Sequence, residues 1–388
     1  MSAPPPLLSD QPRRPVNLLL FGIGAIIFAL LFSTSSLLGS EANSFMGASL
    51  NAVPFAILAI FAYMGGNRPN WAWFATGAWL TLLISATSLT ALGLSFAALS
   101  NGPLNDPANL SRLTPSAWLS LGLILLGILA SISLGTLLLI PAVRQFLTRR
   151  LPNNPASFVH TTALITVVTI GLICTMPLIV LGAPPLLALV DQLSGVTQAR
   201  DQAGMLRDQL YGLIWTIPAA VFAVGFGVRR NLREALERLG LVRPTARQSA
   251  LAVVAALLLA GGVQLLGAGI TWLWAALGWP ATDTAAFGEL LAFAINPIGA
   301  VVIGVVAGLG EELAVRGVLQ PRLGLILSNL FFVSLHALQY SWDALLVVFV
   351  VGVVCGLVRK YSNTTTAAIV HGTYNFTLIM LAVAGLGQ

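Results

Sequence analysis

The chain alternates between apolar runs of about 20 residues and short segments that are richer in charged and turn-forming residues. A helix of about 20 apolar residues spans the hydrocarbon core of a bilayer, whereas the strands of a membrane barrel would alternate apolar and polar positions. Backbone groups in lipid must also be hydrogen-bonded internally, which a helix provides. The pattern therefore predicts an all-α, polytopic transmembrane helical bundle of about 11 spans: 16–38, 48–66, 71–99, 117–143, 158–181, 210–228, 248–276, 297–320, 323–342, 344–358 and 364–386.

One charged segment has helical periodicity but too few apolar residues to cross a membrane. Leu232, Leu236 and Leu239 recur at helical spacing between Arg229 and Gly240, so one face is apolar and the other charged. Such a helix lies along the membrane surface. The chain is thus expected to have three parts: a disordered cytoplasmic N-terminus (1–15), an N-terminal transmembrane region of about six spans that ends in this amphipathic helix (16–246), and a C-terminal transmembrane core (247–388).

Composition supports the membrane assignment and limits the partners. Hydrophobic residues make up 57% of the 388 residues and charged residues 8%, with a mean hydropathy of +0.90, whereas a soluble protein is about 25% charged. The net charge of +6 comes mostly from arginines in short loops, a pattern typical of membrane topology. We therefore expect an integral, multi-pass protein surrounded by the lipid bilayer, with no nucleic-acid partner. The arginine-rich composition favours a bacterial cytoplasmic membrane.

Positive charge also predicts the orientation. With the N-terminus in the cytoplasm and about 11 alternating spans, all of the 19 lysines and arginines except Arg112, Arg200 and Arg207 fall on the cytoplasmic side. The opposite orientation would reverse this distribution. The C-terminus is then expected outside. The two cysteines, Cys174 and Cys355, fall inside predicted spans and are expected to pack there without forming a disulfide.

The predicted span 297–320 contains charged side chains, which are energetically unfavourable in the hydrocarbon core of a membrane. Glu311 and Glu312 are adjacent, and Arg316 follows Glu312 by four residues, so the latter two share a helical face. A charged side chain at the bilayer centre costs at least about 2.5 kcal/mol. Such groups therefore face a cavity, a partner or a substrate path.

Two later spans carry histidines at the same predicted depth. Counted along each helix from the nearest predicted cytoplasmic turn, Glu311, His336 and His371 lie about 16, 18 and 15 Å deep at 1.5 Å per residue. Asn375 lies one turn after His371, and Phe332 lies one turn before His336. The sequence thus predicts that one carboxylate and two imidazoles from three helices meet near the middle of the membrane.

This set of groups can support two kinds of hydrolysis. A carboxylate beside an imidazole can take a proton from water and make it nucleophilic, while a second imidazole and an amide can donate hydrogen bonds to a tetrahedral oxyanion. A carboxylate and two histidines can equally bind Zn²⁺ with an open position for water. The residue spacing leaves both mechanisms open.

Each of the predicted spans 297–320, 323–342 and 364–386 carries one motif. In chain order these are Glu311-Glu312-x-x-x-Arg316, Phe332-x-x-x-His336 and His371-x-x-x-Asn375. The three motifs in this order resemble the signature of the CPBP family. This family includes CAAX-type prenyl-protein endopeptidases and the bacteriocin-processing and immunity proteins that are also called Abi proteins. The resemblance covers 297–386 and implies that 247–388 is a catalytic core, to which 16–246 is accessory.

The resemblance implies an intramembrane endopeptidase, of either the glutamate type or the zinc metalloendopeptidase type. Its expected catalytic group is Glu311, Glu312, His336, His371 and Asn375, supported by Arg316 and Phe332. Glu311 would be the base, His336 would help to activate the water, and His371 with Asn375 would form the oxyanion site. Glu312 would form an ion pair with Arg316. No cofactor is favoured, and Zn²⁺ on Glu311, His336 and His371 is the alternative. The expected partner is a peptide or protein substrate, either lipidated or unmodified.

Two other functions fit the same residues. A non-catalytic immunity or scaffold protein could use them to bind a peptide partner. A proton-coupled transporter is a third reading, because glutamate and histidine inside a membrane also form proton relays. The paired broken helices that are typical of many transporters are not visible in the sequence, which counts against the transporter.

Overall fold

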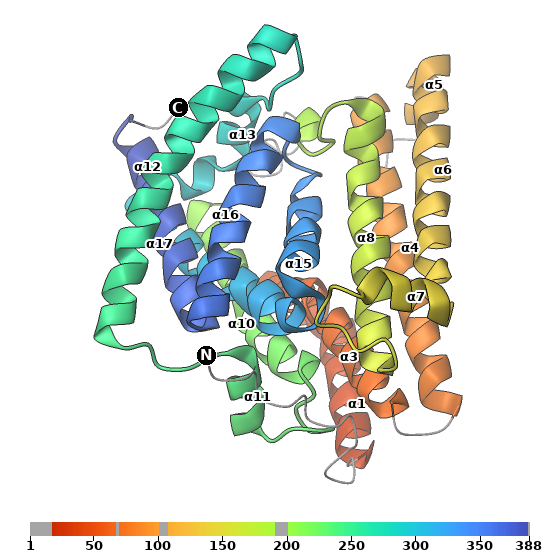
Figure 1. Cartoon of the computed structure of the whole chain (residues 1–388). Helices are drawn as coiled ribbons and strands as arrows, with labels where there is room; N and C mark the ends of the chain where they lie inside the picture. Colours follow the sequence, from red (N-terminus) through yellow and green to blue (C-terminus); the bar gives the residue numbers. More distant parts are fainter. Residues whose placement is uncertain (1–17, 67–69, 101–107, 191–200, 387–388) are drawn as a thin grey trace.

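The computed structural model describes residues 18–66, 70–100, 108–190 and 201–386, and within these ranges every regular element is a helix (Figure 1). One isolated β-bridge joins Phe226 and Arg230. The all-α prediction is therefore confirmed for the part of the chain that is described. The segment 1–15, which was expected to be disordered, lies outside it.

The N-terminal part of the chain consists of long apolar helices joined by short helical turns. In chain order these elements are α1 (Leu18–Thr34), η1 (Ser35–Leu37), α2 (Ser40–Ala48), η2 (Ser49–Asn51), α3 (Val53–Gly65), α4 (Asn70–Ser100), α5 (Asn109–Arg112), α6 (Pro115–Leu137), α7 (Pro141–Thr148), α8 (Phe158–Leu181), η3 (Leu187–Leu189) and α10 (Gln202–Ala223).

The C-terminal part contains all the motif residues. Its elements are α11 (Leu232–Leu239), α12 (Ala246–Leu277), α13 (Thr284–Leu290), η4 (Ala292–Ala294), α14 (Pro297–Val305), η5 (Val306–Glu311), η6 (Leu313–Leu319), α15 (Gln320–His336), α16 (Trp342–Tyr361) and α17 (Thr364–Val383). The amphipathic segment predicted around 229–240 is α11. The helix begins with a capping box formed by Asn231 and Glu234, and it ends at Gly240.

Seven helical segments of the described chain are long and apolar enough to cross a membrane, and a pair bent by 46° (Ser40–Asn51 with Val53–Gly65) makes eight if it is taken as one span. The seven segments are Asn70–Ser100, Pro115–Leu137, Phe158–Leu181, Ala246–Leu277, Pro297–His336, Trp342–Tyr361 and Thr364–Val383. The multi-pass arrangement is thus supported, while the count of about 11 spans and the cytoplasmic N-terminus remain predictions.

Two helix ends bear on the predicted boundaries. The span predicted to reach residue 143 ends at Leu137, because Pro141 lacks the N–H that would continue the helix and instead starts α7. The spans predicted at 297–320 and 323–342 are separated at Gly324, where the backbone leaves the helical conformation between two helices. The φ of Gly324 is 78°, a conformation that glycine adopts readily.

Arg322, which lies just before Gly324, is buried in the protein. Its guanidinium donates to the Tyr63 hydroxyl at 2.6 Å and to the Ala223 carbonyl at the end of α10 at 3.2 Å. Arg230 donates to the same hydroxyl at 3.2 Å. These contacts join α3, α10 and α15, so the N-terminal helices support the helical stretch that holds the acidic pair.

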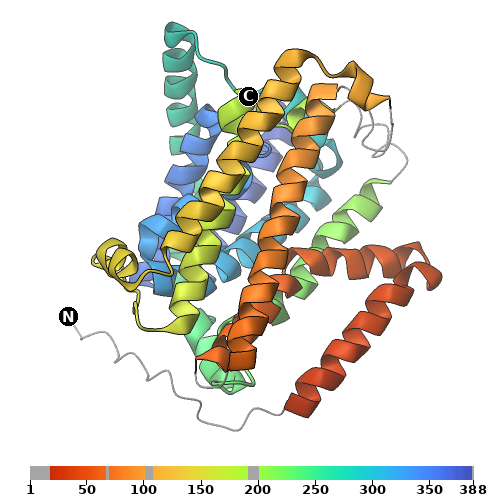
Figure 2. The same ribbon diagram turned by 90° about the vertical axis from the view of Figure 1, so that its right-hand side faces the viewer.

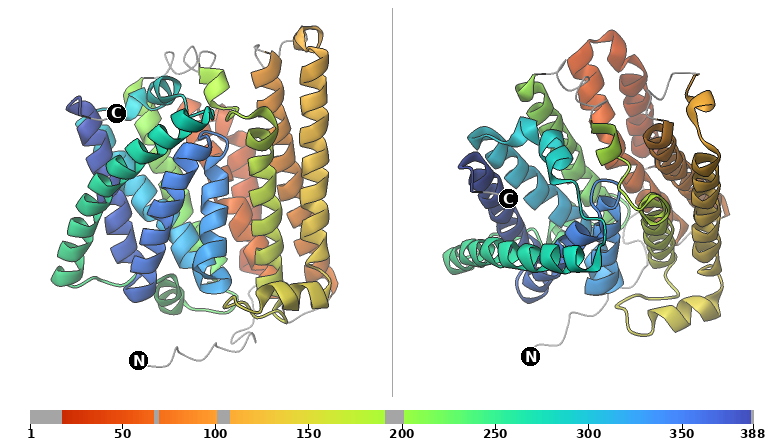
Figure 3. Two further views of the ribbon diagram at one scale, coloured as in Figure 1. Left: turned by 45° about the horizontal axis from the view of Figure 1, so that its top comes forward. Right: turned by 90° about the horizontal axis from the view of Figure 1, so that it is seen from above.

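The helices surround this stretch from several sides. Helix α12 crosses the outside of α16 and α17 obliquely, and Ala256 and Ala260 pack there against Val370 and Tyr374 (Figure 3). Helix α1 lies at the edge of the bundle, and most of its large apolar side chains are exposed, as expected for a helix that faces lipid (Figure 2).

Glycines allow α14 and η5 to lie against α17 with their backbones in contact. A Cβ atom added to Gly304 would lie 2.8 Å from the Gly372 carbonyl oxygen, and one added to Gly308 would lie 2.7 Å from the Ala368 carbonyl oxygen. Small residues at such crossings are typical of helix packing in membranes, because close approach maximises van der Waals contact. This approach brings the acidic pair within reach of His371.

We expect Gly308→Ala to destabilise the protein and Gly310→Ala to be tolerated. A Cβ at Gly310 would lie 3.6 Å from the Leu213 side chain and 4.0 Å from that of Thr216, which are ordinary contacts. Both substitutions gain the same helix propensity, so the difference reports the clash at Gly308, about 1–3 kcal/mol. Unfolding in detergent followed by circular dichroism measures it. Equal stability of the two variants would contradict the close packing.

Candidate active site

The acidic pair lies in a stretch of π-helix. Val306–Glu311 and Leu313–Leu319 both have this wider hydrogen-bonding pattern, and Glu312 stands between them. π-helical turns are rare and are found mostly at functional sites. The wider turn changes the directions in which successive side chains point, so the two adjacent carboxylates can both contact one group on a neighbouring helix.

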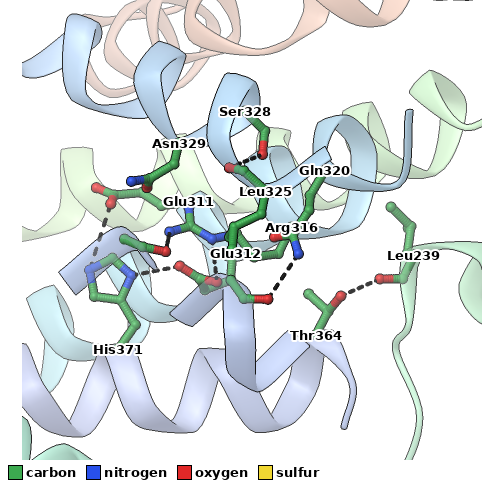
Figure 4. A network of polar contacts seen from close by, with 12 residues as sticks. Leu239, Glu311, Glu312, Arg316, Gln320, Leu325, Ser328, Asn329, Thr364 and His371 are labelled. Atoms are coloured by element: carbon green, nitrogen blue, oxygen red, sulfur yellow. Dashed lines mark hydrogen bonds and ion pairs between the residues drawn. The ribbon is translucent and has the colours of Figure 1, made fainter. Parts of the chain in front are cut away.

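That group is the imidazole of His371 on α17. Its Nδ1 atom lies 2.9 Å from Glu312 Oε1, and its Nε2 atom lies 3.8 Å from Glu311 Oε2 (Figure 4). An ionised carboxylate can only accept a hydrogen bond, so Nδ1 carries a proton and donates it to Glu312. The longer distance at Nε2 exceeds a direct hydrogen bond and leaves this nitrogen available to a reacting group.

The two carboxylates differ in their surroundings. Glu312 is fully buried and pairs with Arg316, whose side chain is 1% exposed and whose Nε atom lies 3.3 Å from Glu312 Oε2. The Glu311 side chain is 37% exposed. A buried charge needs a partner, and Glu312 has two in Arg316 and His371. Glu311 is the carboxylate that water and a substrate can reach.

Phe332 on α15 is the common neighbour of the other site residues. Its ring centroid lies 4.7 Å from that of His336 and 6.2 Å from that of His371, both in edge-to-face geometry. The Arg316 guanidinium carbon lies 4.9 Å from the same centroid, in cation–π geometry. Phe332 is itself buried, so its ring fixes the positions of three polar side chains.

The tautomer of His336 follows from its hydrogen bond to a backbone carbonyl. His336 Nδ1 lies 2.9 Å from the Phe332 carbonyl oxygen. A carbonyl can only accept, so Nδ1 carries the proton and the neutral ring has its lone pair on Nε2. His336 also stacks on Tyr340, with the ring centroids 5.8 Å apart. The half-buried ring is thus held at the end of α15 with an acceptor nitrogen available.

The structure brings most of the predicted group together. Glu311 and Glu312 meet His371 directly, Arg316 joins through Glu312, and His336 joins through the Phe332 ring. Asn375 is half-buried one turn after His371. Its amide has no side-chain hydrogen bond to any described residue, so its donors are available to a ligand. His160, the third histidine, lies in the first turn of α8. Its Nδ1 accepts a hydrogen bond at 2.9 Å from the backbone N–H of Asn154, which lies in the loop before this helix.

The residues expected to bind Zn²⁺ do not form a ready-made metal site. Among the described residues, three side chains that can bind a metal lie close together: Glu312, Cys355 and His371. Each offers one ligand atom, and these atoms lie within 4.8 Å of one another. Glu311 and His336 are not part of it. Zinc on Glu311, His336 and His371 and the preference for a metal-free site both stay predictions.

Sequence reasoning missed how α16 is attached to the site. Arg316 Nη2 donates to the Gly352 carbonyl at 2.7 Å, and Gln320, one turn later, donates to the Gly356 carbonyl at 2.8 Å. Asn329 donates to the Phe349 carbonyl at 3.0 Å. The Gly-x-x-x-Gly spacing of 352 and 356 was the available signal, because such spacing marks close helix contacts in membranes.

We expect the Glu312–Arg316 pair to be strongly coupled in a double-mutant cycle. Arg316→Met leaves a buried carboxylate without its cation and should cost about 3–5 kcal/mol. Glu312→Gln in the same chain should restore part of this loss. The exposed pair Arg233–Glu237, also four residues apart, is the control, with coupling of about 0.3–0.5 kcal/mol. Denaturant unfolding in detergent measures both cycles, and similar coupling in both would contradict the role of burial.

Comparison with known protein families gives a match in the C-terminal part of the chain. Neither the curated proteins nor the solved structures gave a match to this chain. A protein-family model does match, over residues 293–377, and its description is type II CAAX prenyl endopeptidase Rce1-like. The matched segment contains all three motifs and confirms the resemblance to the CPBP family there. Residues 293–377 are thus similar to the Rce1-like domain of a family of CAAX prenyl endopeptidases.

Proposed function

We propose that the protein is a membrane-embedded endopeptidase that hydrolyses a peptide bond with a water molecule activated by Glu311. The observation that carries this proposal is the position of His371 between a buried, paired carboxylate and an accessible one. The match of residues 293–377 to an endopeptidase family supports the same reaction class.

Glu311 is the general base in this proposal because it is the accessible member of the pair. A water molecule beside its carboxylate would lose a proton to Glu311 as the oxygen attacks the peptide carbonyl. His336 assists, since its unprotonated Nε2 can accept a hydrogen bond from the same water. Glu312 does not reach the substrate in this account. It positions His371 and keeps a proton on Nδ1.

His371 and Asn375 stabilise the oxyanion of the tetrahedral intermediate. His371 Nε2, when protonated, points a donor to the side of the ring where Glu311 lies. The Asn375 amide lies one turn away on the same face of α17. Donors fixed before the reaction in a water-poor site stabilise developing charge more strongly than donors in bulk water. Collapse of the intermediate releases the amine, with the proton held by Glu311 as its source.

The substrate proposed is a peptide segment whose scissile bond enters the membrane at the level of His371. The name of the matched family points to substrates with a prenylated C-terminal cysteine. Cleavage of one peptide with and without its prenyl group would decide whether the lipid is required here.

We expect Glu311→Gln to lower the cleavage rate of a peptide substrate by about 10²–10⁴-fold, the usual contribution of a general base. The amide keeps the size of the side chain but cannot take a proton. Glu237→Gln, which removes an exposed carboxylate on α11, should cleave at the wild-type rate. The measurement is product formation by purified protein in detergent or liposomes.

Wild-type cleavage by the Glu311→Gln protein would remove Glu311 from the mechanism. A cellular phenotype that survives this substitution, with no cleavage detectable for either protein, would favour the non-catalytic peptide-binding function.

We also expect removal of metal ions to leave the activity unchanged. The proposed water activation uses only side chains of the chain, so dialysis against a strong chelator should alter the cleavage rate by less than about twofold. The measurement is the same peptide assay before and after chelation, with metal analysis of the protein. Loss of activity that Zn²⁺ restores would replace the glutamate mechanism with a metal-dependent one.

A further inference from the structure

Cys355 is a buried thiol that the proposed reaction does not use. It lies on α16, is fully buried and forms no disulfide. Its Sγ atom, a Glu312 carboxylate oxygen and a His371 ring nitrogen all lie within 4.8 Å of one another. Cys174, the other cysteine, is on α8 and is not part of this group.

A thiolate, an imidazole and a carboxylate together are a donor set for a soft or borderline divalent cation. Zn²⁺ takes all three ligand types, and thiolate ligands favour zinc and similar soft ions over Mg²⁺ or Ca²⁺. Bond lengths of about 2.0–2.3 Å in tetrahedral geometry place neighbouring ligand atoms about 3.3–3.8 Å apart. From separations of at most 4.8 Å, the group therefore needs a contraction of at most about 1.5 Å, which side-chain rotation can supply.

The charges around the group also suit a divalent cation. Glu311, Glu312 and a Cys355 thiolate carry three negative charges, and Arg316 carries one positive charge, so an added divalent cation brings the cluster to neutrality. Binding forms the metal–sulfur bond and releases the thiol proton to solvent. The exposed Glu311 side chain marks the side from which an ion can enter.

We propose that Glu312, Cys355 and His371 form a binding site for a thiophilic divalent cation, of which Zn²⁺ and Cd²⁺ are examples, and that the bound ion inhibits the enzyme. A bond from His371 Nδ1 or Glu312 to the metal replaces the hydrogen bond between them, so the imidazole is no longer held in the position that the proposed reaction requires. The inhibition rests on the proposed protease function, whereas the binding does not. Metal here blocks the reaction and is not its cofactor.

The test is a titration of the full-length protein in detergent with Cd²⁺, followed by the ultraviolet charge-transfer absorption of a cadmium–thiolate bond. The wild type and Cys174→Ala should show one saturable band. Cys355→Ala should lose the band and need about 100-fold or more Cd²⁺ for any equivalent change, since even indirect partners of a metal ligand contribute 10–100-fold to affinity.

Absence of the band in the wild type, or an equal band in Cys355→Ala, overturns the proposal. Cys355→Ser, which keeps the size of the side chain, replaces the alanine variant if that protein does not fold, and should also lose the band. Loss of the band in Cys174→Ala, with the band intact in Cys355→Ala, would place the metal on α8 and also overturn it.

A second measurement separates this site from the protease proposal. Cys355→Ala should cleave peptide at the wild-type rate and resist concentrations of Cd²⁺ that inhibit the wild type. A thiolate band at Cys355 in a protein that cleaves no peptide would support the metal site and count against the protease. Equal inhibition of both proteins would refute the inhibitory role of Cys355.

Discussion

The structure depends on the pairing of buried charges around Glu312. A carboxylate with no exposure to solvent is stable only with a partner, and here Arg316 and His371 supply the cation and the hydrogen-bond donor. Arg316 in turn donates to the Gly352 carbonyl and packs on Phe332. One buried charge thus fixes the relative positions of the π-helical segment, α15, α16 and α17.

Backbone contacts make this pairing possible. The glycines of α14, η5 and α17 allow two helices to touch, and the π-helical turn directs both neighbouring carboxylates to one imidazole. Burial then separates their roles. Glu312 is shielded and fixed, which suits a positioning group, while Glu311 is accessible, which suits a base that must exchange protons with water. The same arrangement places Cys355 beside the group.

The sequence predicted the members of the site better than its geometry. Charges in an apolar chain are rare enough to be found by inspection, and helix rise placed Glu311, His336 and His371 at one depth. Rise along a helix does not say which way a side chain points, so the contact of Glu312 with His371 was not anticipated. The π-helical turn and the thiol of Cys355 were missed, because both depend on how one helix packs against another.

For the fold as well, local features could be predicted from the sequence, whereas contacts between helices could not. Long apolar runs predicted the helices, since hydrophobicity over 20 residues is a strong local signal. The burial of Arg322 and its hydrogen bonds to Tyr63 and Ala223 depend on tertiary packing, which local sequence does not contain. Residue types alone do not say which ligand atoms come together, because groups that share a depth need not converge on one point.

The contact between Glu312 and His371 can be measured directly by nitrogen NMR of protein labelled with ¹⁵N-histidine, because the chain has only 3 histidines. The account predicts a protonated, strongly hydrogen-bonded Nδ1 for His371, whose signal shifts in Glu312→Gln while that of His160 does not. A His371 Nδ1 signal that is bare of a proton, or that is the same in both proteins, would contradict the arrangement on which the proposed chemistry rests.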